Sequence, residues 1–184
     1  MQFKAQETPI EGLLVIEPKL FKDERGYFME FFRKSEFKDL GVDLEFVQDN
    51  QSRSRRGTLR GLHFQKTQPQ AKLVRAVRGR VFDVAVDLRK GSPTFGRWHG
   101  VVLDDEARRL FFIPAGFAHG FLALSDGAEF AYKCSDYYLA EDEGGVLWND
   151  PDIGIDWPLG EIGEPLLSEK DKNLPRLKDL GFSY

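Results

Sequence analysis

Two segments set the fold class and the candidate site of this chain: Gly57-Thr58-Leu59-Arg60-Gly61-Leu62-His63-Phe64-Gln65 and Ala71-Lys72-Leu73-Val74-Arg75. Residues 58–65 and 71–78 are rich in Leu, Val and Phe, and a polar loop containing Pro69 separates them. This pattern predicts two strands, which need not pair with each other. Together they carry a histidine, a lysine and two arginines at the positions quoted above, and we expect a functional site there.

His63 is the only side chain in these segments that gains and loses a proton near neutral pH, which makes it a candidate base. Arg60 and Lys72 are fixed cations, suited to a phosphorylated substrate or to the negative charge that forms when carbon loses a proton. The alternative is a solvated basic edge strand with an incidental imidazole. Strict alternation puts Arg60 and His63 on opposite faces, so both reach one pocket only if Gly61 bulges or the strand ends there.

The chain has 184 residues, 41% hydrophobic and 30% charged, with a formal net charge of -4. This length predicts a single domain over residues 1–184, in which a loop-rich part over residues 141–184 packs on the main body. The charge balance argues against general nucleic-acid binding. No apolar run approaches the roughly 20 residues that span a bilayer, and Met1 to Lys4 opens no signal peptide, so we expect a cytoplasmic protein without membrane contact.

The 16 phenylalanines and many short apolar runs interrupted by Gly and Asp favour a mainly β protein. Further strands are predicted at residues 13–18, 27–32, 46–52, 81–88 and 117–124. Residues 98–103 and 109–113 are predicted to form a hairpin through the acidic turn 104–106. A short helix from Ser35 to about Leu40 is expected to cap the end of a barrel, and Ser168 is predicted to be the N-cap of a second helix.

Alternation along the strands selects side chains that face a cavity. Asp83 lies opposite the apolar face of residues 82–88 and is either solvated or aimed into a cavity, where it needs a partner. His119, between two phenylalanines, is either a satisfied core residue or a pocket wall. Tyr132 and Cys134 share a strand face, and the single cysteine, which excludes an internal disulfide, is expected to be buried and inert. Asp171 is either part of a helix cap or an acidic partner for a base.

The usual motifs of several enzyme classes are missing from the sequence. The three histidines are dispersed, and His63 lacks the second, closely spaced histidine of a metal-binding β-barrel, so no metal is expected. There is no phosphate-binding glycine loop, no Gly-x-Ser-x-Gly elbow and no dinucleotide fingerprint. A candidate base, a candidate acid in Tyr132 and nearby fixed charges suit proton abstraction next to a carbonyl.

Eight blocks of sequence, in a fixed order, match a known enzyme family. They are Asp23 to Glu30, Phe46 to Asn50, Leu59 to Gln65, Lys72 to Arg75, Phe82 to Val84, Pro114 to Phe121, Tyr132 to Cys134 and Leu167 to Asp171. On these blocks the chain resembles the dTDP-4-dehydrorhamnose 3,5-epimerases. The resemblance implies a cupin-like jelly-roll β-barrel (double-stranded β-helix) with a few short peripheral helices, a homodimer, and no metal or cofactor. The implied reaction converts a dTDP-sugar, dTDP-4-dehydro-6-deoxy-D-glucose, into dTDP-4-dehydro-L-rhamnose.

The resemblance also implies roles for individual side chains. His63 would be the base, held by the carboxylate of Asp171. Tyr132 would supply a proton from the opposite face of the sugar ring, while Lys72 would face the C4 oxygen. The positions that match nucleotide- and sugar-binding residues are Arg25, Glu30, Gln48, Asn50, Arg60, His119, Glu143 and Lys170, to which we add Lys72 and Asp83. Tyr137 or Tyr138 is expected to stack on thymine.

The implied chemistry is coherent, because C3 and C5 both adjoin the C4 ketone and one base can serve both carbons through an enolate. Two alternatives remain: an epimerase that inverts only one carbon, and a cupin-fold nucleotide-sugar 3,4-ketoisomerase or binding protein. Having both His63 and Tyr132 favours the epimerase. The predicted strand from Tyr27 to Phe32 carries large side chains on both faces, which suggests that a partner subunit covers one face and receives Arg25 and Glu30 in its site.

Overall fold

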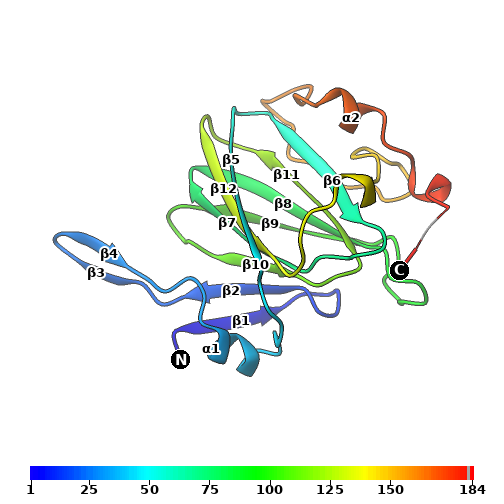
Figure 1. The fold of residues 1–184 in the computed structure, drawn as a ribbon. Coiled ribbons are helices and arrows are strands. Elements are labelled where there is room, and N and C mark those ends of the chain that lie inside the picture. The colour runs from blue at the N-terminus through cyan, green and yellow to red at the C-terminus, as the bar shows by residue number, and fades with distance from the viewer. Residues whose placement is uncertain (182) are drawn as a thin grey trace.

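The computed structural model describes residues 1–181 and 183–184. Two antiparallel sheets lie face to face and form the body of the molecule (Figure 1). The first sheet contains, in spatial order, β1 (Phe3–Glu7), β2 (Leu14–Pro18), β10 (Leu110–Ile113), β7 (Lys72–Arg78), β12 (Ala128–Cys134) and β5 (Gln48–Ser54). The second contains β13 (Glu143–Gly145), β6 (Leu59–Gln65), β11 (Phe117–Ala123), β8 (Arg80–Asp87) and β9 (Trp98–Asp104). The prediction of a mainly β protein is confirmed, and the two sheets are not closed into one continuous sheet.

The chain crosses from one sheet to the other between β9 and β10, which corrects one prediction. β9 pairs with β8, whereas β10 pairs with β2 and β7 of the other sheet. The hairpin predicted from 98–103 and 109–113 is therefore wrong. The acidic turn itself is present, since the Asp104 carboxylate accepts hydrogen bonds from the amides of Glu106 and Ala107. Arg108, in a left-handed conformation with φ of 56°, follows this turn before the chain enters the first sheet.

Alternation along β8 divides the core into two layers. Val81 and Ala85 pack between the sheets, in a cluster that also contains Phe121 and Phe130. Val84 and Val86 face the other side and pack with Trp157 and other apolar side chains of the C-terminal part. The C-terminal part thus packs on the outer face of the second sheet. Among the described residues from 141 onward, regular structure is limited to the end of the 3₁₀ turn Ala140–Asp142, β13, α2 and the 3₁₀ turn Leu177–Asp179.

Two short helices flank the sheets. The sequence predicts that the first one caps a barrel end, but α1 (Lys34–Asp39) packs on the outer face of the first sheet, because its buried Phe37 joins an apolar cluster there with Ile16 and Leu73. α2 (Glu169–Lys172) begins after Ser168, whose Oγ accepts a hydrogen bond from the Asp171 amide at 3.1 Å, so the predicted N-cap is confirmed. Within the described part of the chain, neither helix has the length and apolar character needed to cross a membrane.

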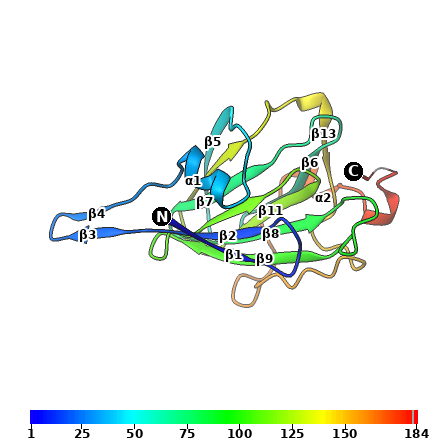
Figure 2. The ribbon, with the colours of Figure 1, turned by 90° about the horizontal axis from the view of Figure 1, so that it is seen from below.

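The strands β3 (Phe21–Asp23) and β4 (Gly26–Phe28) form a separate hairpin, here called the arm, that projects away from the body (Figures 1 and 2). The aromatic strand predicted at 27–32 is wrong in extent, since β4 ends at Phe28 and pairs only with β3. The arm exposes its rings to solvent, with Tyr27 49% and Phe28 64% exposed. A two-stranded hairpin has no apolar core of its own in which to bury these rings, so they stay largely exposed in a single copy of the chain.

Candidate active site

Two adjoining cavities lie between the sheets. They are at the side of the molecule where β5 forms the edge of the first sheet and β6 is next to the edge of the second. Cavity A has a volume of about 300 Å³ and cavity B about 310 Å³, and the residues that line both are His63, Lys72 and Tyr132. Side chains that line cavity A alone include Gln48, Asn50, Gln65, Cys134, Tyr138 and Glu143. Those that line cavity B alone include Ser52, Arg60, His119, Phe121, Phe130, Lys170 and Asp171.

His63 is held by a carboxylate that is 108 residues away in sequence. Its Nε2 lies 2.6 Å from Oδ1 of Asp171, which α2 presents from a position with 3% exposure. Burial disfavours the ionised carboxyl of Asp171, but hydrogen bonds from His63, Ser168 and the Gly61 amide outweigh this effect and hold its pKa below the usual value. With Nε2 engaged, Nδ1 is the ring nitrogen left to act as a base, and it lies 4.0 Å from Oε1 of Glu143.

Gly61 brings Arg60 and His63 to the same cavity. The pairing of β6 with β11 shifts register at this point, where His63 lies opposite His119 but Arg60 lies opposite Phe121. Gly61 has φ of 116°, and a Cβ there would lie 2.7 Å from the Gly120 Cα and from the His119 carbonyl oxygen. Only glycine fits this close approach of two backbones. The irregularity that alternation required at Gly61 is therefore confirmed.

Three ionisable side chains gather beside the cavities: Lys72 and His119 line them, and Asp83 lies buried next to His119. Asp83 is fully buried, and its two carboxylate oxygens lie 3.0 and 2.9 Å from Nε2 of His119. His119 lines cavity B, so it is both a pocket wall and a satisfied buried residue. Burial lowers the pKa of Lys72, and the negative charges of Asp83 and Glu143 act against this effect. Burial also raises the pKa of Asp83, with His119 and Lys72 opposing it.

Tyr132 lines both cavities, as His63 does, but comes from β12 in the other sheet. Burial raises the pKa of its hydroxyl, with a further contribution from Cys134, so the phenol keeps its proton through the neutral range. Cys134 is 1% exposed, as expected, and the Asn50 amide donates a hydrogen bond to its sulfur over 3.7 Å. Burial also raises the pKa of this thiol.

Several predicted binding residues form a hydrogen-bonded rim around cavity A. The Gln48 amide donates to Oδ1 of Asn50 at 3.0 Å and accepts from the backbone amide of Tyr138 at 2.9 Å. The Tyr138 hydroxyl donates to Glu143 at 2.6 Å, which raises the pKa of Tyr138 to about 12. Glu143 also forms an ion pair with Lys170 from cavity B. Burial opposes ionisation of Glu143, but Lys170, Tyr138 and His63 together lower its pKa.

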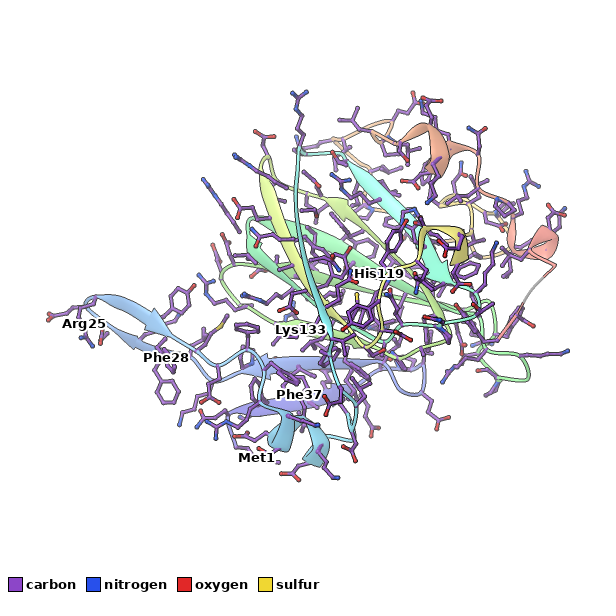
Figure 3. All side chains as sticks on the ribbon, viewed as in Figure 1. Met1, Arg25, Phe28, Phe37, His119 and Lys133 are labelled. Atoms are coloured by element: carbon purple, nitrogen blue, oxygen red, sulfur yellow. The ribbon has the colours of Figure 1, made fainter. Side chains whose placement is uncertain are left out.

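Four of the predicted site residues do not line the cavities, and one of them, Asp83, is fully buried beside His119. Arg25 occupies the tip of the arm, far from the labelled His119 between the sheets (Figure 3), and pairs with Asp23 at 2.5 Å. Glu30 pairs with Arg33 just beyond the arm. Tyr137 is 62% exposed and does not line either cavity. Arg25 and Glu30 therefore do not join the site within one copy of the chain.

Sequence reasoning missed several cavity residues. Gln65 holds the loop that carries Tyr138 through both atoms of its side-chain amide. Its Nε2 donates to the Tyr137 carbonyl at 3.1 Å, and its Oε1 accepts from the backbone amide of Leu139 at 2.7 Å. Phe121 and Phe130, whose ring centroids are 4.3 Å apart, form the apolar wall of cavity B. Alternation could have identified both phenylalanines, because Phe121 shares a strand face with His119 and Phe130 shares one with Tyr132. In the part of the chain that the structure describes, no three His, Cys, Asp or Glu side chains gather as a metal site.

Comparison with known proteins identifies the family. The model of the family described as dTDP-4-dehydrorhamnose 3,5-epimerase matches residues 7–179. The enzyme of that name from Methanothermobacter thermautotrophicus is 56% identical over 97% of this chain and 96% of its own length. The one from Pseudomonas aeruginosa is 54% identical over 92% and 93%.

Solved structures agree with this assignment. RmlC from Legionella pneumophila, a dTDP-6-deoxy-D-glucose-3,5-epimerase in complex with dTDP-4-keto-L-rhamnose, has a TM-score of 0.93 and 52% identity over 97% of this chain and 94% of its own. ChmJ, a 3'-monoepimerase from Streptomyces bikiniensis, has a TM-score of 0.87 and 43% identity over 93% and 86%. These neighbours confirm the expected cupin-like jelly roll. The chain belongs to the dTDP-4-dehydrorhamnose 3,5-epimerase family.

Proposed function

We propose that this protein is an isomerase that converts dTDP-4-dehydro-6-deoxy-D-glucose into dTDP-4-dehydro-L-rhamnose by inverting C3 and C5. The observation that carries the proposal is the junction of the two cavities, where His63, Lys72 and Tyr132 line one space. His63 and Tyr132 come from opposite sheets, so a sugar ring between them has a base on one face and an acid on the other. Family membership supports the same reaction.

In the proposed mechanism, Nδ1 of His63 removes the proton from C5 or C3, and the electron pair moves onto the C4 oxygen as an enolate. The ammonium of Lys72 stabilises the charge on that oxygen. Asp171, bound to Nε2 at 2.6 Å, stabilises the imidazolium that forms. Tyr132 then gives its proton to the opposite face of the carbon, which inverts it, and both side chains exchange their protons with solvent before the second centre reacts.

The nucleotide would be held by cations and by the rim of cavity A. Arg60 and Arg25 are proposed to bind the pyrophosphate, because guanidinium groups donate two parallel hydrogen bonds to phosphate oxygens. Gln48, Asn50, His119, Glu143 and Lys170 are proposed to bind the nucleotide and sugar, and Tyr137 or Tyr138 to stack on thymine. Both tyrosines are exposed, at 62% and 50%, so their rings are accessible to a base.

We further propose a homodimer in which the arm reaches the site of the second copy. This would bring Arg25 and Glu30, which lie away from the cavities of their own chain, to a substrate. The exposed rings of Tyr27 and Phe28 give the arm an apolar surface for such a contact. Light scattering at micromolar concentration should report twice the monomer mass, and a fully active monomer would contradict the dimer. The cytoplasmic location expected from the sequence stays a prediction.

The main alternative is inversion of a single carbon, which the likeness to the 3'-monoepimerase ChmJ supports. The same base and acid serve one centre or two, so these residues do not distinguish the outcomes. A ketoisomerase or a binding protein would not need an acid opposite the base.

The test is turnover of the 4-dehydro sugar by the purified protein and by His63→Ala. Loss of the general base should slow turnover by at least about 10²–10⁴-fold. Near wild-type turnover in a folded His63→Ala variant would refute the proposed role of the base.

A further inference from the structure

The segment that follows β12 carries Tyr138 to the wall of cavity A without belonging to a sheet. Residues 136–139, here called the Tyr138 segment, lie between β12 and the 3₁₀ turn Ala140–Asp142, and no strand in the described part of the chain pairs with them. Tyr137 and Tyr138 are 62% and 50% exposed. An exposed segment without a ladder of backbone hydrogen bonds opens at low free-energy cost unless other groups hold it.

Three glutamine side chains hold the Tyr138 segment in place of a neighbouring strand. They form one hydrogen bond with the backbone of each residue in the segment: Gln70 Nε2 with the Asp136 carbonyl at 2.7 Å, Gln65 Nε2 with the Tyr137 carbonyl at 3.1 Å, Gln48 Oε1 with the Tyr138 amide at 2.9 Å, and Gln65 Oε1 with the Leu139 amide at 2.7 Å. Gln65 makes two of these bonds, one on each side of Tyr138. It is 4% exposed, so solvent does not replace the bonds if its side chain is changed.

The strand pairing at Gln65 also fixes the ring of Tyr138. Gln65 lies opposite Glu143 in the pairing of β6 with β13, and Glu143 accepts a hydrogen bond from the Tyr138 hydroxyl at 2.6 Å. One residue of this pair thus holds the backbone on both sides of Tyr138, and the other holds its hydroxyl. Contacts within the chain therefore keep the half-exposed ring at the wall of cavity A, which Tyr137 does not line.

A ring that is already in position makes binding tighter, because a ligand that had to order the segment would lose that free energy from its affinity. Resting on the proposed function, we propose that Gln65 is a positioning residue that holds Tyr138 ready to stack on the thymine of the substrate. Both polar atoms of the Gln65 side chain are engaged within the chain, so Gln65 acts through Tyr138 and not by contact with the nucleotide.

The experiment measures calorimetric affinity for dTDP and steady-state kinetics with the wild-type protein, Gln65→Met and Gln6→Met. Methionine keeps the length of the side chain and removes both polar atoms. Gln65→Met should bind dTDP about tenfold more weakly and raise KM for the dTDP-sugar, with kcat within about twofold of the wild type, because the reacting groups are untouched. Gln6→Met, at an exposed position of β1, should behave as the wild type does.

Combination with Tyr138→Ala decides whether Gln65 acts through the ring. In that background Gln65→Met should change the dTDP affinity less than about twofold, because the ring that it positions is gone. A general loosening of cavity A would instead weaken dTDP binding equally in both backgrounds. Gln70→Met removes one bond at the other end of the segment and should show a smaller weakening with the same dependence on Tyr138, so it tests the inference if Gln65→Met does not fold.

Hydrogen exchange of the backbone amides tests the hold on the segment without a ligand. Residues 136–139 should exchange faster in Gln65→Met than in the wild type. Unchanged exchange, unchanged dTDP affinity, or equal weakening with and without Tyr138→Ala would each overturn the inference, and so would a fall in kcat at unchanged KM. If the wild type binds no dTDP while exchange responds as expected, the proposed function fails and the hold on the segment stands, so the two failures are distinguishable.

Discussion

Replacing Asp171 by Asn tests the carboxylate that holds the proposed base. The substitution keeps the size of the side chain but removes the charge 2.6 Å from Nε2 of His63. The side chain is 5% exposed, so solvent does not replace the lost interaction. A hydrogen bond to a charged group contributes about 1.5–3 kcal/mol. Since about 1.36 kcal/mol corresponds to a tenfold rate change, kcat should fall about 10- to 160-fold.

The effect should appear in kcat, because the imidazolium that Asp171 stabilises forms only as the proton leaves carbon. KM should change little. The fold should persist, since the helix cap uses the backbone amide of Asp171 and the Ser168 hydroxyl. Glu169→Gln is the matched control, because this 85% exposed side chain lies on the same short helix and pairs with Lys172.

Steady-state rates, with thermal melting to verify folding, provide the assay. A double variant with His63→Ala should be no slower than His63→Ala alone, because the two groups act as a unit. A folded Asp171→Asn variant with wild-type kcat would refute the reasoning.

Three further changes test other parts of the account. Tyr132→Phe should lose inversion while deuterium exchange at C3 or C5 continues, and undiminished formation of the doubly inverted sugar, seen by NMR, would exclude Tyr132 as the acid. Burial lowers the pKa of Lys72, so activity should begin to fall at a lower alkaline pH than the deprotonation of a free lysine would give. Lys72→Arg should move this fall in activity to higher pH, because arginine keeps its proton. An unshifted pH profile in Lys72→Arg would contradict this. Burial of Asp87 is outweighed by hydrogen bonds from Arg89 and neighbouring hydroxyls, which lower its pKa from 3.8 to about 2. The ionised Asp87 carboxylate therefore stabilises the folded protein by about 2 kcal/mol above pH 4, and this contribution is lost as the pH falls to about 2. In urea titrations Asp87→Asn should be less stable than the wild type at pH 7, and the difference in free energy of unfolding should become smaller in acid.

The local sequence pattern predicted which face of a strand a side chain lies on better than it predicted which strands pair with each other. Period-two alternation in 81–88 put Asp83 opposite the apolar strand face but left open whether it is solvated or faces a cavity, and the structure shows it buried in a pair with His119. The hairpin of 98–113 was wrong because a turn signal reports a change of direction and does not report which sheet receives the next strand. The strand predicted at 27–32 was wrong in extent because aromatic residues favour a strand in a core and on an exposed hairpin alike, so they do not mark where the strand ends.

The site was predictable in its residue types and less so in its geometry. His63 and Asp171 are 108 residues apart, so spacing carries no information about their contact, and only the family resemblance implied it. Gly61 was different, because the need to bring Arg60 and His63 together required an irregularity at the one residue that tolerates it. Gln65 gave no local signal, since its importance depends on hydrogen bonds that only the folded chain defines.

The central claim is that one base and one acid invert two carbons through a shared C4 enolate. Proton NMR of the product formed in deuterated water tests it most directly. We predict deuterium at both C3 and C5 of a doubly inverted sugar, dTDP-4-dehydro-L-rhamnose, since each new proton comes from a side chain that exchanges with solvent. A product labelled and inverted at only one carbon would support the single-centre alternative. Inversion of both centres without solvent deuterium would contradict the proposed mechanism.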